Sequence, residues 1–417
     1  MWFVLLFVVL VLLSIIHLWN KSPYHPLLVY LGVWVIVIGL WSLDEVFSII
    51  GYIKVSKEAW VNLSLAHISF VIGSVTATIT LIYSQNRNRK LLPRKIIINK
   101  SDSLKAMKIS NFFLILSFVG YLSYIYVVIQ SVDFGAGLAV AFKQWNYEAS
   151  YGQLAMFGGL SGRLYNLPTL AIPYNVFLIS IFPEQKKRLI IISCIEIFFL
   201  ISPRRAILIQ TLMVVLFILL LTRTIRISIK ILVIPIILLI LFSFSQVVLN
   251  KGQGEGIFGG LKVIYLYITG NIPSFDLLMD RNREGMGLMS LSNFYKFLNA
   301  IGYRFENVDL SIDFVNIPTP FNTIPYNYYF LMDFGILGSS FVIFTGAYGI
   351  TFLYYRTMTI FKYLKMEYFT YIYIYSYILM GILFSFRENV LISYNALFFI
   401  LISIMVSLYF KFQTRIV

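Results

Sequence analysis

Residues 109–131, ISNFFLILSFVGYLSYIYVVIQS, contain no charged side chain. As a helix rising about 1.5 Å per residue, this stretch extends over roughly 34 Å, enough to cross a hydrocarbon core about 30 Å thick. Lipid offers the backbone no hydrogen bonds, so a spanning segment has to be a helix or part of a closed barrel. The apolar residues here are continuous rather than alternating, as barrel strands would be. The stretch therefore predicts a transmembrane helix.

Ten further apolar runs follow the same pattern. They lie near residues 2–19, 27–43, 61–84, 164–182, 189–201, 206–222, 231–249, 328–354, 368–386 and 390–410. The first run lacks the basic start and small-residue cleavage site of a signal peptide, so it is counted as a span. With 59% hydrophobic and only 12% charged residues, the chain is predicted to be an all-α polytopic membrane protein with about eleven (ten to twelve) transmembrane helices.

The basic residues gather on one side of these spans. About 20 of the 33 Lys and Arg residues fall there, against three acids, Asp102, Glu184 and Glu367. The positive-inside bias makes this side cytoplasmic, with the C-terminus inside and the N-terminus outside. The net charge of +15 then reflects topology, and no nucleic-acid partner is predicted. The positive-inside bias does not explain the basic residues on the other side, so their presence there needs a different explanation.

The chain divides into a front bundle at 1–249, a large external loop at 250–327 and a rear group of spans at 328–417. The loop is rich in Gly, Asn and Asp, but it includes the aromatic stretches VIYLYI and LSNFYKFLNAIGY. We therefore expect an ordered cap with short interfacial helices. Arg281 and Arg283 in DRNRE, and Arg304 in GYRFE, fit either a solvated surface with local ion pairs or a sugar-phosphate site.

Arg204 and Arg205 interrupt two strongly apolar runs in ISPRRAILIQ, on the predicted external side. Two guanidiniums near a membrane are costly unless something compensates them. Pro203 is well placed to open the following helix, whose N-terminal dipole would add positive potential at the same point. This arrangement suits a phosphate. The alternative is that both side chains reach out to lipid head groups.

Several acidic and aromatic residues lie near the same predicted face. Glu196 is inside an apolar run and about 12 Å along the helix from Arg204, so a neighbouring span must supply its partner. Arg387 and Glu388 form the turn between the last two spans, and Asp333 lies near the external end of the preceding one. Each of these charges fits an interfacial position as well as a functional one. The tyrosines at 326, 328 and 329 suit either a membrane interface or stacking on sugar rings.

The sequence contains no motif typical of metal binding or of nucleotide binding. His17, His25 and His67 are isolated, and the single cysteine, Cys194, lies in an apolar run where it is expected to face lipid or pack. No HExxH, GxSxG or Walker sequence is present. We predict no metal and no cofactor.

Two segments together resemble the Wzy-type polymerases of O-antigen and related bacterial polysaccharides. Residues 202–221, SPRRAILIQTLMVVLFILLL, are similar to that family's Arg-led helix, although Pro203 here precedes a pair of arginines where relatives carry Gly or Ser before one. Residues 321–356, FNTIPYNYYFLMDFGILGSSFVIFTGAYGITFLYYR, are similar to the Asn-Thr, Asp-Phe-Gly, Gly-rich span that follows the family's large periplasmic loop. Which of the two arginines matches the family position stays open.

The resemblance implies a GT-C-like, metal-independent glycosyltransferase of the bacterial inner membrane, with its active site facing the periplasm. Donor and acceptor are oligosaccharides linked to undecaprenyl pyrophosphate, and a chain-length regulator is a conceivable further partner. Pyrophosphate or acceptor contacts would fall to Arg204, Arg205, Arg387, Arg281, Arg283 and Arg304. A carboxylate would accept the hydroxyl proton, with Glu388 the first choice and Asp333 the second.

Two alternatives stay open. An O-antigen ligase would use the same donor, but such ligases typically carry a histidine in the large loop, and 250–327 contains none. A flippase or transporter would line a central cavity with polar residues from many spans. Glu196 is essentially the one central acid here, which favours the polymerase.

Overall fold

The structure is a computed structural model. It describes residues 24–84, 95–96, 100–135, 159–200, 205–222, 256–279, 287–300, 302–305, 314–360, 363–386 and 394–413, with a few isolated positions between them. The chain forms two compact units that interleave in sequence. The first contains Met1–Arg89, Ser228–Arg356 and Gly381–Tyr394, and the second contains Lys90–Ile227, Thr357–Met380 and Asn395–Val417. The predicted division at 249 and 327 follows the chain rather than these units, and it stays a prediction.

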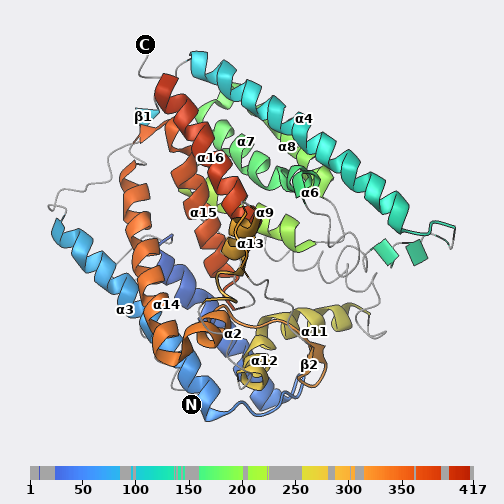
Figure 1. The fold of residues 1–417 in the computed structure, drawn as a ribbon. Coiled ribbons are helices and arrows are strands. Elements are labelled where there is room, and N and C mark those ends of the chain that lie inside the picture. Colours follow the sequence, from blue (N-terminus) through green and yellow to red (C-terminus); the bar gives the residue numbers. More distant parts are fainter. Residues whose placement is uncertain are drawn as a thin grey trace. The chain divides into compact units, whose positions relative to one another are not determined.

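The first unit combines long apolar helices with the short elements of the large loop (Figure 1). Its elements are α2 (Pro26–Phe47), α3 (Lys57–Ser84), α11 (Gly256–Thr269), α12 (Asn271–Leu278), α13 (Ser292–Ala300), the antiparallel pair β2 (Val315–Asn316) and β3 (Pro320–Phe321), and most of α14 (Asn327–Ile360). Helix α11 packs on α2, and α12 packs on α3. The stretches VIYLYI and LSNFYKFLNAIGY lie largely in α11 and α13, which confirms that the loop contains short helices.

The second unit is built around α4 (Lys100–Ser131), on which other apolar helices pack. Its further elements are β1 (Lys95–Ile96), α6 (Gly159–Asn166), α7 (Pro168–Ile181), the 3-10 turn η1 (Pro183–Gln185), α8 (Lys186–Leu200), α9 (Arg205–Leu221), β4 (Tyr363–Leu364), η2 (Met366–Tyr368), α15 (Phe369–Leu383, its last residues in the first unit) and α16 (Tyr394–Gln413). Strand β1 pairs in parallel with β4. Helix α7 contacts α4, α8 and α9.

Five helices within the described residues are long and apolar enough to cross a membrane. They cover Pro26–Phe47, Lys57–Leu81, Ser101–Ser131, Leu160–Ile181 and Asn327–Met358, and each overlaps a predicted span. The chain is therefore a helical membrane protein. Two shorter apolar helices, Ile207–Leu221 and Ala396–Phe412, coincide with two more predicted spans, whereas the predicted spans at 2–19 and 231–249 lie outside the described residues apart from Val9. The count of eleven stays a prediction.

Two glycines shape the first unit. Gly335 interrupts α14 with φ 64° and ψ −172°, a left-handed backbone that L side chains rarely adopt, so the helix kinks just after Asp333 and Phe334. Gly73 of α3 allows close contact with α14, because a Cβ added there would lie 2.2 Å from the Phe344 carbonyl oxygen. Small residues at helix contacts allow this close approach in membranes. Gly120 of α4 plays the same role in the second unit, where a Cβ would lie 2.3 Å from the backbone of Leu164 and Tyr165 in α6.

Candidate functional site

Three of the eight predicted site residues fall within the described part of the chain. Arg205 is the first residue of α9, which begins within two residues of Pro203, as expected. Arg304 is exposed in the short segment after α13, and Asp333 lies in α14. The other five, Arg204, Arg281, Arg283, Arg387 and Glu388, lie outside the described residues. Because Arg205 belongs to the second unit and Arg304 and Asp333 to the first, each is described within its own unit.

Asp333 holds the large loop against α14. One of its carboxylate oxygens accepts a hydrogen bond from the Met289 backbone N–H at 3.0 Å, and the other accepts one from the Ser290 N–H at 2.6 Å. The side chain is only 6% exposed. Gly287, with φ 76°, begins this turn beside Phe334. The segment that follows Arg281 and Arg283 is thereby fixed to the start of the Asp-Phe-Gly helix, and this geometry favours an anchoring role for Asp333.

An aromatic and polar cluster surrounds the start of α14. The Tyr30 hydroxyl lies 2.6 Å from His67 Nδ1 and 3.1 Å from the Tyr326 hydroxyl. Trp34 Nε1 donates to Ser385 Oγ at 3.2 Å, and the Tyr326 N–H donates to the Ser385 carbonyl at 2.9 Å. Burial raises the pKa of Tyr326 above its ordinary value, so its hydroxyl stays protonated and can act as donor or acceptor toward Tyr30.

The contact between Tyr326 and Ser385 ties two distant parts of the chain together. Ser385 comes two residues before Arg387, and Tyr326 ends the large loop. Arg387 and Glu388 follow this contact directly in sequence but lie outside the described residues.

Two further carboxylates organise the first unit and were not among the predicted site residues, and one of them, Asp276, fastens the large loop. Asp276 of α12 accepts hydrogen bonds from the Ser56 N–H at 2.9 Å and from the Ser56 hydroxyl at 2.5 Å. Asp44 at the end of α2 accepts the N–H groups of Ile50, Gly51 and Tyr52. Their partners are mostly backbone N–H groups, and for Asp276 they lie far away in sequence, so residue type and spacing did not reveal them. An acid directly beyond an apolar run, as at Asp44, is the available signal.

The hydroxyl and amide groups of the loop add to these anchors. The Thr323 hydroxyl donates to Asn271 Oδ1 at 2.7 Å, and the Tyr52 hydroxyl lies 2.7 Å from Thr269 Oγ1. The Tyr265 hydroxyl donates to the Leu40 carbonyl, and burial raises the pKa of Tyr265 to about 12. These groups stay protonated at neutral pH. The loop is thus attached to α2, to the segment before α3, and to α14 by buried or half-buried polar contacts, as expected for an ordered cap.

The second unit contains a buried polar chain across three helices. Glu196 of α8 accepts a hydrogen bond from Asn175 Nδ2 of α7 at 2.8 Å, and the Ser110 hydroxyl of α4 donates to Asn175 Oδ1 at 2.7 Å. Glu196 and Asn175 are fully buried. The prediction that a neighbouring span supplies the partner of Glu196 is confirmed, and the partner is an amide rather than a cation. Cys194, two residues earlier, is exposed on the same helix.

Replacement of Glu196 tests whether the hydrogen bonds among Ser110, Asn175 and Glu196 stabilise the fold. Within the described residues Glu196 Oε1 has no hydrogen-bond partner, so Glu196→Gln should keep the Asn175 contact and leave thermal stability in detergent unchanged or higher. Glu196→Ala should remove the acceptor and lower stability by about 1–3 kcal/mol, because Asn175 Nδ2 is left buried without a partner. Thermal melting of the purified variants measures both. Equal melting temperatures for Gln and Ala would show that the contact contributes nothing.

No family model, curated protein or solved structure matches the chain. The assignment of function therefore depends on the residues and on the geometry above.

Proposed function

We propose that this membrane protein is a Wzy-type polymerase, which joins oligosaccharide repeat units linked to undecaprenyl pyrophosphate into a surface polysaccharide at the periplasmic face of the bacterial inner membrane. The sequence resemblance supplies the reaction class. The observation that supports it best is the behaviour of the residues that resemble the family: Thr323, Asp333 and Gly335 each organise the return of the large loop into α14. The residues that resemble the family are thus the ones that attach the large loop to α14.

The proposed reaction transfers the growing chain to a new lipid-linked unit. A hydroxyl oxygen of the acceptor sugar attacks the anomeric carbon of the donor, the bond from that carbon to the pyrophosphate oxygen breaks, and undecaprenyl pyrophosphate leaves. Negative charge develops on the leaving group, which preorganised Arg donors stabilise. Arg204 and Arg205 are proposed for this role, with the N-terminus of α9 adding its dipole.

The hydroxyl proton needs an acceptor, for which Glu388 is the first candidate. The buried Asp333 carboxylate already accepts two backbone N–H groups, which makes it the weaker one. Arg387 lies next to Glu388, so the same turn would bring a cation and a base to the cap beside Tyr326. Arg281, Arg283 and Arg304 would then contact the acceptor sugar or its phosphates from the loop.

Deletion of the gene in its own host separates the proposed function from its alternatives. We expect the surface polysaccharide, separated on a gel beside a complemented strain, to collapse from a ladder to core plus a single repeat unit, because ligation and flipping continue. Loss of every repeat with lipid-linked polymer accumulating would indicate a ligase. Loss of every repeat with single lipid-linked units retained at the cytoplasmic face would indicate a flippase. An unchanged ladder would refute the polysaccharide assignment.

A further inference from the structure

The turn after α13 exposes two aromatic rings of the large loop. Tyr303 is 60% exposed and Phe305 is 40% exposed, and their ring centres lie 6.1 Å apart with an angle of 28° between the ring planes. The tyrosines at 326, 328 and 329, which the sequence also suits to stacking on sugars, are buried or half-buried. Tyr303 and Phe305 thus present roughly parallel rings at the surface of the loop.

Hydrogen bonds fix the backbone that carries these rings. Gly302, at φ 105°, donates its N–H to the Asn299 carbonyl at 3.2 Å. The Tyr303 N–H donates to the Leu298 carbonyl, also at 3.2 Å, which completes the pattern in which a glycine with positive φ ends a helix. The Asn299 side chain pairs with the Phe305 backbone in both directions, with Nδ2 donating to its carbonyl at 2.9 Å and Oδ1 accepting its N–H at 2.6 Å. The backbone under the rings is therefore ordered before a ligand arrives, which lowers the entropy cost of binding.

The chemistry of this surface suits a saccharide better than a lipid head-group layer. The face of an aromatic ring carries partial negative charge, which attracts the C–H groups on the face of a pyranose ring. Residues 302–313, GYRFENVDLSID, contain one basic residue and three acidic ones. A segment that anchors a protein to anionic lipid carries an excess of Lys and Arg instead. The exposed rings are therefore better matched to a sugar.

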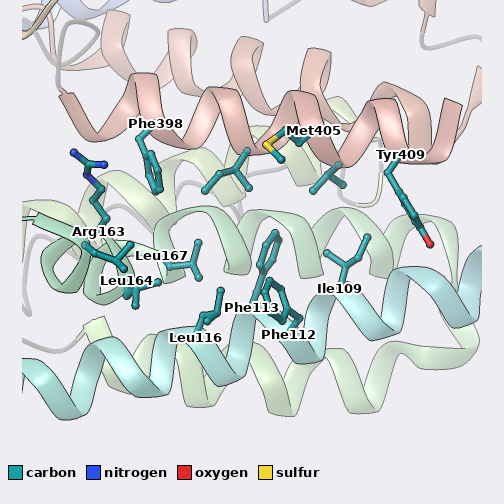
Figure 2. Close-up of a pocket in the computed structure, with 13 residues that line it drawn as sticks. Ile109, Phe112, Phe113, Leu116, Arg163, Leu164, Leu167, Phe398, Met405 and Tyr409 are labelled. Atoms are coloured by element: carbon teal, nitrogen blue, oxygen red, sulfur yellow. The ribbon is translucent and has the colours of Figure 1, made fainter. Parts of the chain in front are cut away.

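The cavity of the second unit offers no comparable place for a sugar. Helices α4, α6 and α16 line a cavity of about 480 Å³, and only Arg163 and Tyr409 among its lining side chains carry polar groups (Figure 2). A pyranose ring has several hydroxyl groups, and such an apolar wall would leave most of them without hydrogen bonds.

We propose that Tyr303 and Phe305 form a stacking platform for a pyranose ring of the lipid-linked oligosaccharide. Tyr295 of α13 supports the platform, with its ring centre 5.0 Å from that of Phe305. The exposed Arg304 lies between the two aromatic residues in sequence, and its guanidinium donates hydrogen bonds to hydroxyl groups of the sugar. The identity of the ligand rests on the proposed function, whereas the platform is tested by binding alone.

Saturation-transfer NMR on the purified full-length protein in detergent measures this binding without turnover. The probe is the repeat-unit oligosaccharide, released from the host's lipid-linked intermediate by mild acid. We expect the ring C–H protons of one sugar to receive saturation from the protein. Tyr303→Ala and Phe305→Ala should each weaken binding by roughly three- to tenfold, the contribution of one aromatic ring contact. Tyr303→Phe keeps the ring and should bind normally.

Phe314→Ala is the matched control, because Phe314 is an exposed aromatic residue of the same loop outside residues 302–305. This variant should bind the oligosaccharide as the unmodified protein does, and equal melting temperatures should show that every variant keeps its fold. If Tyr303→Ala and Phe305→Ala bind as tightly as the unmodified protein, or if the unmodified protein does not bind the oligosaccharide, the rings form no sugar platform. Either result leaves the proposed function standing, because that function is judged by the ladder of the deletion strain.

A nitroxide label distinguishes the sugar platform from a lipid anchor. Tyr303→Cys in a Cys194→Ser background provides one labelling site, since Cys194 is the single cysteine of the chain. In lipid bilayers, a water-soluble relaxing agent should reach this label more readily than oxygen does. The reverse order would place residue 303 in lipid and overturn the assignment to a sugar.

Discussion

Arg205→Ala and Arg204→Ala are each expected to lower polymerisation by at least about a hundredfold. Removing one preorganised donor from a site that stabilises developing negative charge typically costs 10²–10³ in turnover. Arg205 begins α9, and the N-terminus of a helix adds positive potential through its dipole. Lysine at either position should restore part of the activity, since it keeps the charge and loses the bidentate geometry.

The measurement is elongation of lipid-linked repeat units by membranes that contain each variant at equal abundance. Arg188→Ala serves as the matched control, because Arg188 is exposed on α8 and donates a hydrogen bond to Asn111 on the predicted cytoplasmic side. That variant should polymerise normally. If both Arg204→Ala and Arg205→Ala retain full activity, the pyrophosphate binds elsewhere. Loss in only one variant would identify which arginine matches the family position.

Gly73→Ala is expected to lower the stability of the first unit by about 1–3 kcal/mol, the usual cost of forcing extra volume into a packed contact. The new Cβ would lie 2.2 Å from the Phe344 carbonyl oxygen and 3.0 Å from its carbon, and both are backbone atoms that cannot rotate away. Helix α14 would have to move, which would also strain the 2.8 Å contact between the Ser74 and Thr351 hydroxyls. The gain in helix propensity from Gly to Ala, at most about 1 kcal/mol, is smaller.

Gly346→Ala is the control for this change. Gly346 lies two residues beyond Phe344 on α14, and an added Cβ there meets no atom within 4 Å, so the variant should melt at the same temperature or slightly higher. Thermal melting in detergent compares the two. Equal melting temperatures for Gly73→Ala and Gly346→Ala would show that α3 and α14 do not approach as closely as described. Gly120→Ala should behave like Gly73→Ala, because α6 backbone lies 2.3 Å from its added Cβ.

The membrane-spanning helices could be predicted because each of them is long, apolar and free of charge over most of its length. The run at 109–131 needed no tertiary information, and α4 contains all of it. The break between α6 and α7 also has a local cause, since Pro168 begins α7 and has no backbone N–H to continue the helical hydrogen bonds of α6. The kink of α14 was harder to foresee, because it depends on the backbone at Gly335 alone among the glycines of that span.

The candidate site could be predicted only as a set of residues, not as an arrangement. Glu196 shows the limit: its position in an apolar run predicts a partner on another helix, but not that Asn175 is that partner. Asp333 was expected to be an interfacial charge or a base, and its acceptance of two loop N–H groups depends on residues more than forty positions away. The type of a side chain does not show which distant backbone groups it contacts. Local patterns therefore identify elements better than they identify the contacts between them.

The two carboxylates that fasten the large loop also determine how that loop can move. Asp276 attaches the loop to the segment before α3, and Asp333 attaches it to α14, while Asp44 orders the connection between α2 and α3. Each carboxylate accepts hydrogen bonds from at least two donors. Moving the loop away from one of these carboxylates would therefore break two hydrogen bonds at once. Local opening is expected to be cooperative under these conditions. The part of the loop that these two side chains attach is therefore expected to open as one unit, with both hydrogen bonds of a carboxylate lost in the same step.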